Sequence, residues 1–116
     1  MIHILLCDQI NDDEWQYLVD RSVNASYFQT KACYDFYCQL SFLKPFLYAV
    51  SENGQLKALV CGYVVADGGM VKSFFSRRAI APGGVLLDES VSEQALTLLL
   101  TTLKRDLTKQ AIYIEI

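Results

Sequence analysis

The residues best suited to bind a ligand are basic and lie in the second half of the chain. Lys72, Arg77 and Arg78 form a cluster of positive charge outside the predicted helices. Lys72 and Arg78 are six residues apart, so on a regular strand they share one face while Arg77 points to the other. Because a guanidinium can form two parallel hydrogen bonds with phosphate or carboxylate, the cluster predicts contact with an anionic substrate. The alternative is a pair of solvated arginines at a strand end, the ordinary state of surface charges.

Two other features are candidates for the same site. Gly83 and Gly84 follow Pro82, and glycine allows a backbone to approach a ligand closely, although such a pair more often forms a turn. Gln29 precedes a predicted helix and could orient a ligand amide or cap the loop locally. The predicted substrate-binding residues are therefore Lys72, Arg77, Arg78, Gly83, Gly84 and Gln29.

The sequence contains no self-sufficient set of catalytic residues. Glu115 could act as a general base beside an acceptor amine, but neither a histidine nor a second carboxylate lies near it in sequence. His3 is the only histidine, which argues against a histidine-based triad. The sequence therefore does not identify the catalytic residues.

The four cysteines are better explained as buried thiols than as metal ligands. They lie in apolar segments and form no close pair, so their spacing argues against a zinc site. Free cysteine packs as a small hydrophobic residue, and reduced thiols are typical of the cytoplasm, where we expect this protein to reside. The residues concerned are Cys7, Cys33, Cys38 and Cys61.

Composition indicates one folded domain over residues 1–116. Hydrophobic residues make up 53% of the chain and charged residues 20%, which excludes disorder. The net charge of −3 argues against general nucleic-acid binding. Charged or polar residues interrupt every apolar run before the roughly 18 residues that a membrane helix needs, so no membrane span is expected.

The first half of the chain predicts a strand and two helices. Residues 2–7 form an apolar strand, and Asn11 can cap the helix that follows, with Glu14 as its capping-box partner. A second helix is predicted from Thr30 and ends before Lys44, because the residue before a proline disfavours helical backbone. Its apolar face is predicted to contain Ala32, Cys33, Phe36, Tyr37 and Leu40.

The second half predicts a three-stranded meander, a helix and a final strand. The meander strands are residues 46–51, 56–66 and 70–76, and the first two are joined by Asn53-Gly54, a pair suited to a type I′ turn. Residues 85–87 could form a short strand, and Ser90 with Glu93 predicts the start of a long helix. Residues 111–116 then form a hydrophobic strand. The order β-α-α-β-β-β-α-β indicates a mixed α/β fold with an antiparallel centre.

Three segments in this order resemble FemAB-type proteins, which are GNAT-fold aminoacyltransferases that build peptidoglycan interpeptide bridges in bacteria. The segments are Phe28-Gln29-Thr30, residues 76–88 and residues 112–116. The resemblance implies a GNAT-like fold and transfer of an aminoacyl or acyl group to an amine of a cell-wall precursor, with aminoacyl-tRNA as donor. The chain has Cys33 where such proteins commonly carry Trp, and Tyr37 near the position where some place a precursor-binding Lys.

A coenzyme A site is not predicted. GNAT acetyltransferases hold the CoA diphosphate with a Q/R-x-x-G-x-G/A loop that runs directly into a helix, whose first N–H groups bind the phosphates. Here Pro82 follows Arg78 by four residues, and Gly83-Gly84 leads into an apolar segment instead of a helix. Pro82 also removes one N–H donor. No cofactor is therefore expected.

The last residues predict a missing neighbour. A chain usually ends in exposed polar residues, whereas residues 111–116 are those of a buried strand. We therefore expect a truncated, N-terminal GNAT-like part of a longer protein, inactive on its own and completed by the C-terminal remainder. Two alternatives stay open: a non-catalytic GNAT-fold binding module, and a homodimer formed through the open final strand.

Overall fold

The computed structural model describes residues 2–6, 9–22, 25–41, 43–65, 78–108 and 113–115. The described elements follow the predicted order of strands and helices, except for a short strand at residues 78–80 that was not predicted. They are β1 (Ile2–Leu6), α1 (Asp12–Arg21), the 3₁₀ turn η2 (Tyr27–Gln29), α2 (Lys31–Cys38), β2 (Lys44–Glu52), β3 (Gln55–Val65), β4 (Arg78–Ile80), β5 (Leu86–Leu87), α4 (Glu93–Leu107) and β6 (Tyr113–Glu115).

The strands form one mixed sheet in the order β1-β2-β3-β4-β6, with β5 also paired to β3. The pairs β1–β2, β2–β3 and β3–β4 are antiparallel, whereas β4 and β6 are parallel. The prediction of a mixed α/β fold with an antiparallel centre is confirmed. The third meander strand predicted at residues 70–76 lies outside the described residues.

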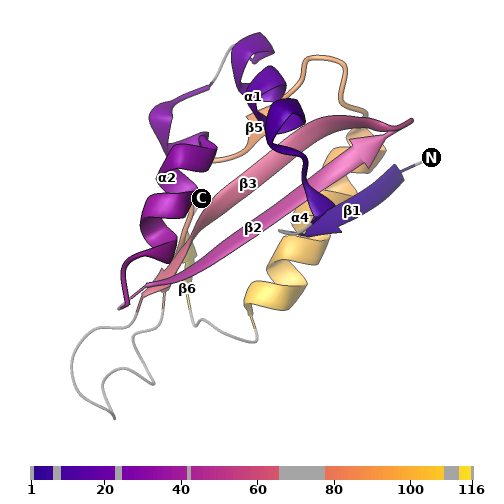
Figure 1. Ribbon diagram of the computed structural model, residues 1–116. Coiled ribbons are helices and arrows are strands. Elements are labelled where there is room, and N and C mark those ends of the chain that lie inside the picture. Colours follow the sequence, from indigo (N-terminus) through magenta and orange to yellow (C-terminus); the bar gives the residue numbers. More distant parts are fainter. Residues whose placement is uncertain are drawn as a thin grey trace.

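Helices cover both faces of the sheet, with α1 and α2 on one side and α4 on the other (Figure 1). Alternation along the strands divides the core accordingly. Tyr48, Val50 and Val60 belong to the cluster that contains Leu99 and Leu103 of α4. Leu47, Ala49 and Leu59 belong to the cluster that contains Trp15 and Leu18 of α1. The two long central strands β2 and β3 are therefore buried on both faces, as the sequence of apolar residues in them requires.

Local signals in the sequence fix several boundaries. The side chain of Asn11 accepts hydrogen bonds from the backbone N–H groups of Asp13 and Glu14 at 2.8 and 3.3 Å, so it caps α1 as predicted. Asn53 and Gly54 join β2 to β3 with φ values of 56° and 81°. Positive φ at both positions is the geometry of a type I′ turn, which confirms the predicted hairpin.

Two sequence predictions are wrong. The N-cap of α4 is Ser92, whose hydroxyl accepts a hydrogen bond from the N–H of Ala95, and Ser90 instead binds the carboxylate of Asp88. Of the apolar face predicted for α2, Cys33 and Tyr37 are buried, but Ala32 is exposed and Phe36 is 51% exposed. The short helix α2 packs against the sheet only through a narrow stripe of its surface, which contains Cys33 and Tyr37. Within the described part of the chain, every helix is too short or too polar to cross a bilayer.

Candidate functional site

The candidate site is built around a break in the strand that lies beside β3. Tyr63 of β3 pairs with Ile80 of β4, and Leu59 pairs with Leu86 of β5. Five residues, 81–85, therefore face only three residues, 60–62, on β3. The extra residues form a large bulge. Bulges are common at sheet edges and near active sites, where they change the direction of the backbone and its side chains. Gly83 and Gly84 lie in this bulge.

Close contact between backbones explains why β3 carries a glycine beside the bulge. A Cβ atom on Gly62 would lie 1.9 Å from the carbonyl oxygen of Ile80 and 2.9 Å from the Cα of Ala81. No side chain can be accommodated at those distances without moving the backbone. Gly62 thus allows β4 and the start of the bulge to approach β3 closely.

Gln29 and Gly83, two of the predicted site residues, are in direct contact. The side-chain Nε2 of Gln29 donates a hydrogen bond to the carbonyl oxygen of Gly83 at 2.6 Å. Its Oε1 accepts a hydrogen bond from the N–H of Ser26 at 2.8 Å, so the same side chain also caps the loop locally. Gln29 is only 1% exposed. Both ends of its amide are therefore committed to holding the bulge against the loop before α2.

The loop that carries Gln29 is itself anchored to the core. The indole Nε1 of Trp15 donates a buried hydrogen bond to the carbonyl oxygen of Gln29 at 2.8 Å. The thiol of Cys61, on β3, contacts the carbonyl oxygen of Phe28 at 3.4 Å. Since α1 and β3 both hold this loop, the position of Gln29 is fixed from two sides.

Gly84 differs from Gly83 in its surroundings. A Cβ on Gly83 would meet Cγ of Gln29 at 2.6 Å, whereas a Cβ on Gly84 would have no heavy atom within 4 Å. Gly84 has a φ of 70°, and its N–H donates to the carbonyl oxygen of Ala81 at 3.0 Å. Gly83 is therefore a packing glycine, and Gly84 is the turn residue on the open side of the bulge.

The basic residues of the predicted site are described only in part. The backbone of Arg78 begins β4, where it pairs with Val65 on one side and with Tyr113 of β6 on the other. Its side chain, and all of Lys72 and Arg77, lie outside what the structure describes. Gln29, Gly83 and Gly84 are thus gathered at the bulge, with the backbone of Arg78 at the far end of the same broken strand.

A group of aromatic rings and thiols that the sequence analysis did not assign to the site lies between α2 and β3. The rings of Tyr37 and Tyr63 pack edge to face with centroids 4.9 Å apart. Burial, with a smaller contribution from nearby Cys33, raises the pKa of the Cys61 thiol to about 12. Burial and a hydrogen bond with Cys33 also raise the pKa of the Tyr37 hydroxyl. The Cys61 thiol and the Tyr37 hydroxyl are therefore neutral at physiological pH and act as packing.

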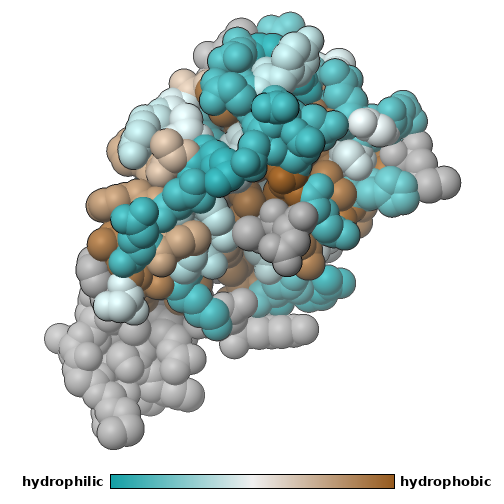
Figure 2. Space-filling view, in the orientation of Figure 1, coloured by the Kyte–Doolittle hydropathy of each residue, from teal (hydrophilic) through white to brown (hydrophobic). Residues whose placement is uncertain are grey.

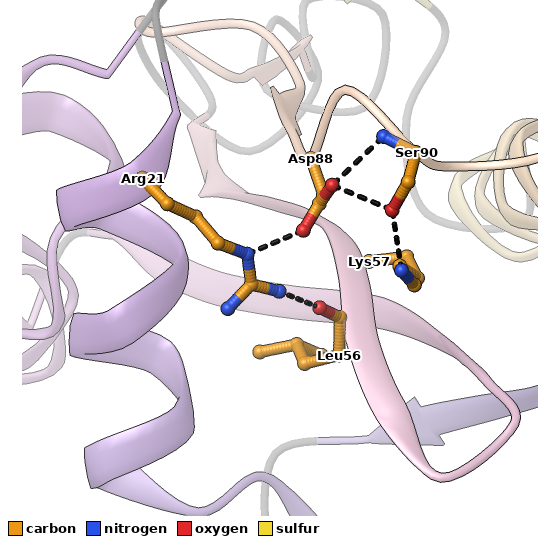
Figure 3. A network of polar contacts seen from close by, with 5 residues as sticks. All are labelled: Arg21, Leu56, Lys57, Asp88 and Ser90. Atoms are coloured by element: carbon orange, nitrogen blue, oxygen red, sulfur yellow. Dashed lines mark hydrogen bonds and ion pairs between the residues drawn. The ribbon is translucent and has the colours of Figure 1, made fainter.

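A network of charged groups lies between β5 and α4, at the other end of the bulge (Figure 3). The Asp88 carboxylate accepts hydrogen bonds from the N–H and the hydroxyl of Ser90, both at 2.8 Å, and forms an ion pair with Arg21 of α1. Arg21 also donates to the carbonyl oxygen of Leu56, and the Lys57 ammonium donates to the Ser90 hydroxyl. The N–H bond from Ser90 is the main cause that lowers the pKa of Asp88 to about 2, with contributions from the Ser90 hydroxyl and Arg21.

A second carboxylate reaches the start of α4 from the end of β2. Oε1 of Glu52 accepts a hydrogen bond from the N–H of Ser92 at 3.2 Å. Hydrogen bonds with Ser92 hold the pKa of Glu52 below its ordinary value. Sequence reasoning missed this network. Its one visible signal was the group of acidic and hydroxyl residues between the short strand and the helix.

Comparisons with known proteins are informative only at the level of structure. The chain matches no protein-family model and no curated protein sequence. Among solved structures, a predicted acetyltransferase with acetyl-CoA from Clostridium acetobutylicum matches 100% of this chain and 80% of its own, with a TM-score of 0.61 and 12% identity. An aminoglycoside acetyltransferase from an uncultured soil metagenomic sample matches 100% of this chain and 76% of its own, with a TM-score of 0.64 and 12% identity. Similarity at this level of identity shows the fold, and the chain has the GNAT-like fold of these acetyltransferases.

Proposed function

We propose that this chain is the N-terminal, GNAT-like part of a FemAB-type transferase, which passes an aminoacyl or acyl group to an amine of a cell-wall precursor. The three sequence segments that carry the resemblance meet in space, and this observation carries the proposal. Gln29 in the first segment hydrogen-bonds Gly83 in the second. Strand β4 in the second segment pairs with β6 in the third. These contacts place parts of all three segments in one connected region of the fold, which is what a shared substrate site requires.

In this proposal the basic residues bind the anionic part of the precursor. Lys72, Arg77 and Arg78 precede or begin β4, and a nucleotide-linked precursor carries phosphates that guanidinium groups bind well. The bulge at Gly84 would present its backbone to the substrate from the open side. Gln29 would act through Gly83, because its own amide is already hydrogen-bonded within the chain. We assign no catalytic residue to the transfer step.

The proposal includes a longer parent protein. Aminoacyl-tRNA would be the donor, a cell-wall precursor amine the acceptor, and the C-terminal remainder of the parent would complete the acceptor site. The isolated chain is then expected to fold without catalysing transfer.

Binding measurements on the parent protein and on this chain test the proposal. UDP-linked muropeptide should raise the melting temperature of the parent, and joint replacement of Arg77 and Arg78 by alanine should abolish the increase. Arg105→Ala is a suitable control, because the Arg105 side chain on α4 is 67% exposed and is distant in sequence from Arg77 and Arg78. Unchanged muropeptide binding in the double variant would remove the two arginines from the site.

A second candidate function is a non-catalytic binding or oligomerisation module with the same fold. Two observations favour it. The Gln29 amide forms its hydrogen bonds within the protein, and a cysteine stands at position 33. Aminoacyl transfer by the parent protein, abolished by the arginine replacements, would exclude this candidate. Absence of transfer together with concentration-dependent self-association would favour it.

A further inference from the structure

The fold of this chain raises the question of coenzyme A, because one of the structures it matches is described with acetyl-CoA. In GNAT acetyltransferases the CoA diphosphate is held by backbone N–H groups at the start of a helix that follows a central strand. The corresponding helix here is α4, which begins at Glu93 after β5. Whether these N–H groups are available can be read from their hydrogen bonds.

The chain's own side chains and backbone already occupy four of the N–H groups before and at the start of α4. The N–H of Ser90 donates to the Asp88 carboxylate and that of Val91 to the Asp88 carbonyl oxygen, at 2.8 and 3.0 Å. The N–H of Ser92 donates to Glu52 and that of Ala95 to the Ser92 hydroxyl, at 3.2 and 3.0 Å. No glycine lies between residues 88 and 95, so a close approach of phosphate to this backbone is not provided for either.

The groups around the Asp88 carboxylate are arranged as they would be around a bound anionic ligand, but here the anion is part of the protein. Its carboxylate accepts from a backbone N–H and a hydroxyl of Ser90 and is paired with the Arg21 guanidinium, while Lys57 lies on the far side of the Ser90 hydroxyl (Figure 3). A backbone N–H, a hydroxyl and two cationic side chains are the groups that bind phosphate in proteins. The Asp88 side chain is only 12% exposed, so it fills this position instead of facing solvent.

We infer that Asp88 is an internal substitute for a ligand phosphate, and that together with Glu52 it closes the start of α4 to the diphosphate of coenzyme A. A diphosphate would have to displace two carboxylates that are joined covalently to the protein, and would meet their negative charge if it did not. The acyl donor of any transfer reaction must therefore be held elsewhere or lack a diphosphate. This inference concerns the helix start alone and does not depend on the proposed transferase.

The primary test uses the wild-type chain labelled with ¹⁵N, titrated separately with coenzyme A, inorganic pyrophosphate and pantetheine, which lacks the diphosphate. The amide resonances of residues 90–95, before and at the start of α4, are expected to stay in place with all three. Movement of these resonances by coenzyme A and pyrophosphate, but not by pantetheine, would overturn the inference. Movement confined to other amides would leave the start of α4 closed, as inferred.

A variant supplies the converse test. Replacing Asp88 by alanine should leave Arg21, Lys57 and the Ser90 N–H free for an external anion, so affinity for pyrophosphate should rise at least about tenfold over wild type. Asp35→Ala is the matched control, since it removes the same charge from an exposed ion pair on α2 and should give no increase. A folded Asp88→Ala protein with wild-type affinity for pyrophosphate would overturn the assignment of Asp88 as an internal anion. If this variant does not fold, the wild-type titration decides alone.

Discussion

The side-chain amide of Gln29 donates a hydrogen bond to the carbonyl oxygen of Gly83 across 54 positions of sequence. This bond joins the loop before α2 to the bulge between β4 and β5. The same side chain accepts from Ser26, and Trp15 holds the Gln29 carbonyl oxygen, so the bulge is tied through one residue to α1. The shape of the candidate site thus depends on a buried amide whose two ends both form hydrogen bonds within the protein.

Replacing Gln29 by alanine should destabilise the protein by about 2 kcal/mol or more, because the Ser26 N–H and the Gly83 carbonyl would lose buried partners. Gly83→Ala should cost about 1–3 kcal/mol, since its Cβ would lie 2.6 Å from Cγ of a side chain that two hydrogen bonds hold in place. The double variant should cost less than the sum of the two, because removing Gln29 makes room for the new methyl group. Urea unfolding of the four proteins measures this cycle, and strict additivity would contradict it.

Gly84→Ala provides the contrasting case in the same bulge. A Cβ there would meet no heavy atom within 4 Å, but φ is 70°, in the left-handed region. We expect a loss of about 1 kcal/mol that arises from the backbone and is independent of Gln29. The loss should therefore be the same in the wild-type and Gln29→Ala backgrounds, as measured by urea unfolding. A loss that differs between the two backgrounds would contradict the absence of contacts on the side of the bulge where Gly84 lies.

Gly62→Ala should be more damaging than either bulge variant. The new Cβ would lie 1.9 Å from the Ile80 carbonyl oxygen, and both partners are backbone of paired strands. Since neither can rotate away, β4 would have to separate from β3, at a cost of about 3 kcal/mol or more. Hydrogen exchange of the amides in β4 and β3 should reveal the separation. Protection equal to wild type would refute the close approach.

Some features of the fold were predictable because the interactions behind them are local. The Asn11 cap and the Asn53-Gly54 turn each depend on residues within three positions of each other, and both were predicted. The cap of α4 was assigned to Ser90 because Glu93 stands three residues later. Asp88, two residues before Ser90, instead binds both the N–H and the hydroxyl of that serine, and the helix begins after Ser92.

The site was less predictable because its contacts are distant in sequence. The sequence predicted that Gly83-Gly84 is not followed directly by a helix. The strand β5 at Leu86–Leu87 agrees with that prediction. The sequence could not indicate that Gln29 reaches Gly83, nor that Arg21 and Glu52 converge on the start of α4. Periodicity also predicted a buried Phe36, since it counts apolar residues without knowing which side of α2 meets the sheet. Figure 2 shows hydrophobic residues at the surface on this part of the molecule.

The Asp88 network predicts that acid weakens the fold. The pKa of Asp88 is about 2 in the folded protein against an ordinary value of 3.8, so the unfolded chain takes up the proton first as pH falls. Its stabilisation is fully present above pH 3.8 and is lost as pH falls towards 2, and amounts to about 2 kcal/mol at most. The lowered pKa of Glu52 acts in the same direction. Unfolding free energies between pH 5 and pH 2 should show a shallower fall in Asp88→Asn than in wild type.

Asp35→Asn is the control for the pH experiment. Asp35 forms an exposed i,i+4 ion pair with Lys31, and its side chain is 51% exposed. Such pairs contribute little to stability, so this variant should keep the wild-type pH dependence. A wild-type slope in Asp88→Asn, with a reduced slope in Asp35→Asn, would mean that the network of Figure 3 does not hold the start of α4.

Trp15→Phe tests the anchor of the Gln29 loop. Phenylalanine keeps an aromatic ring against Tyr34, 6.0 Å away between centroids, but lacks the indole N–H that donates to the Gln29 carbonyl oxygen. We expect a loss of about 1–3 kcal/mol from the unsatisfied carbonyl and the smaller ring. Circular dichroism is the appropriate probe, because Trp15 is the only tryptophan and the variant has no indole fluorescence. A stability equal to wild type would mean that the loop is held without this bond.

Thiol reactivity should distinguish the cysteines by burial. Cys33 and Cys61 are 2% and 1% exposed, and burial raises the pKa of Cys61 to about 12, so almost no reactive thiolate forms there at neutral pH. Cys38, at the end of α2, is exposed. In a Cys7→Ser background, an aromatic disulfide reagent should modify one thiol rapidly in the folded protein and the other two only on unfolding in urea. Adding Cys38→Ser should remove the rapid phase; its persistence would show that β3 and α2 open to solvent in the native state.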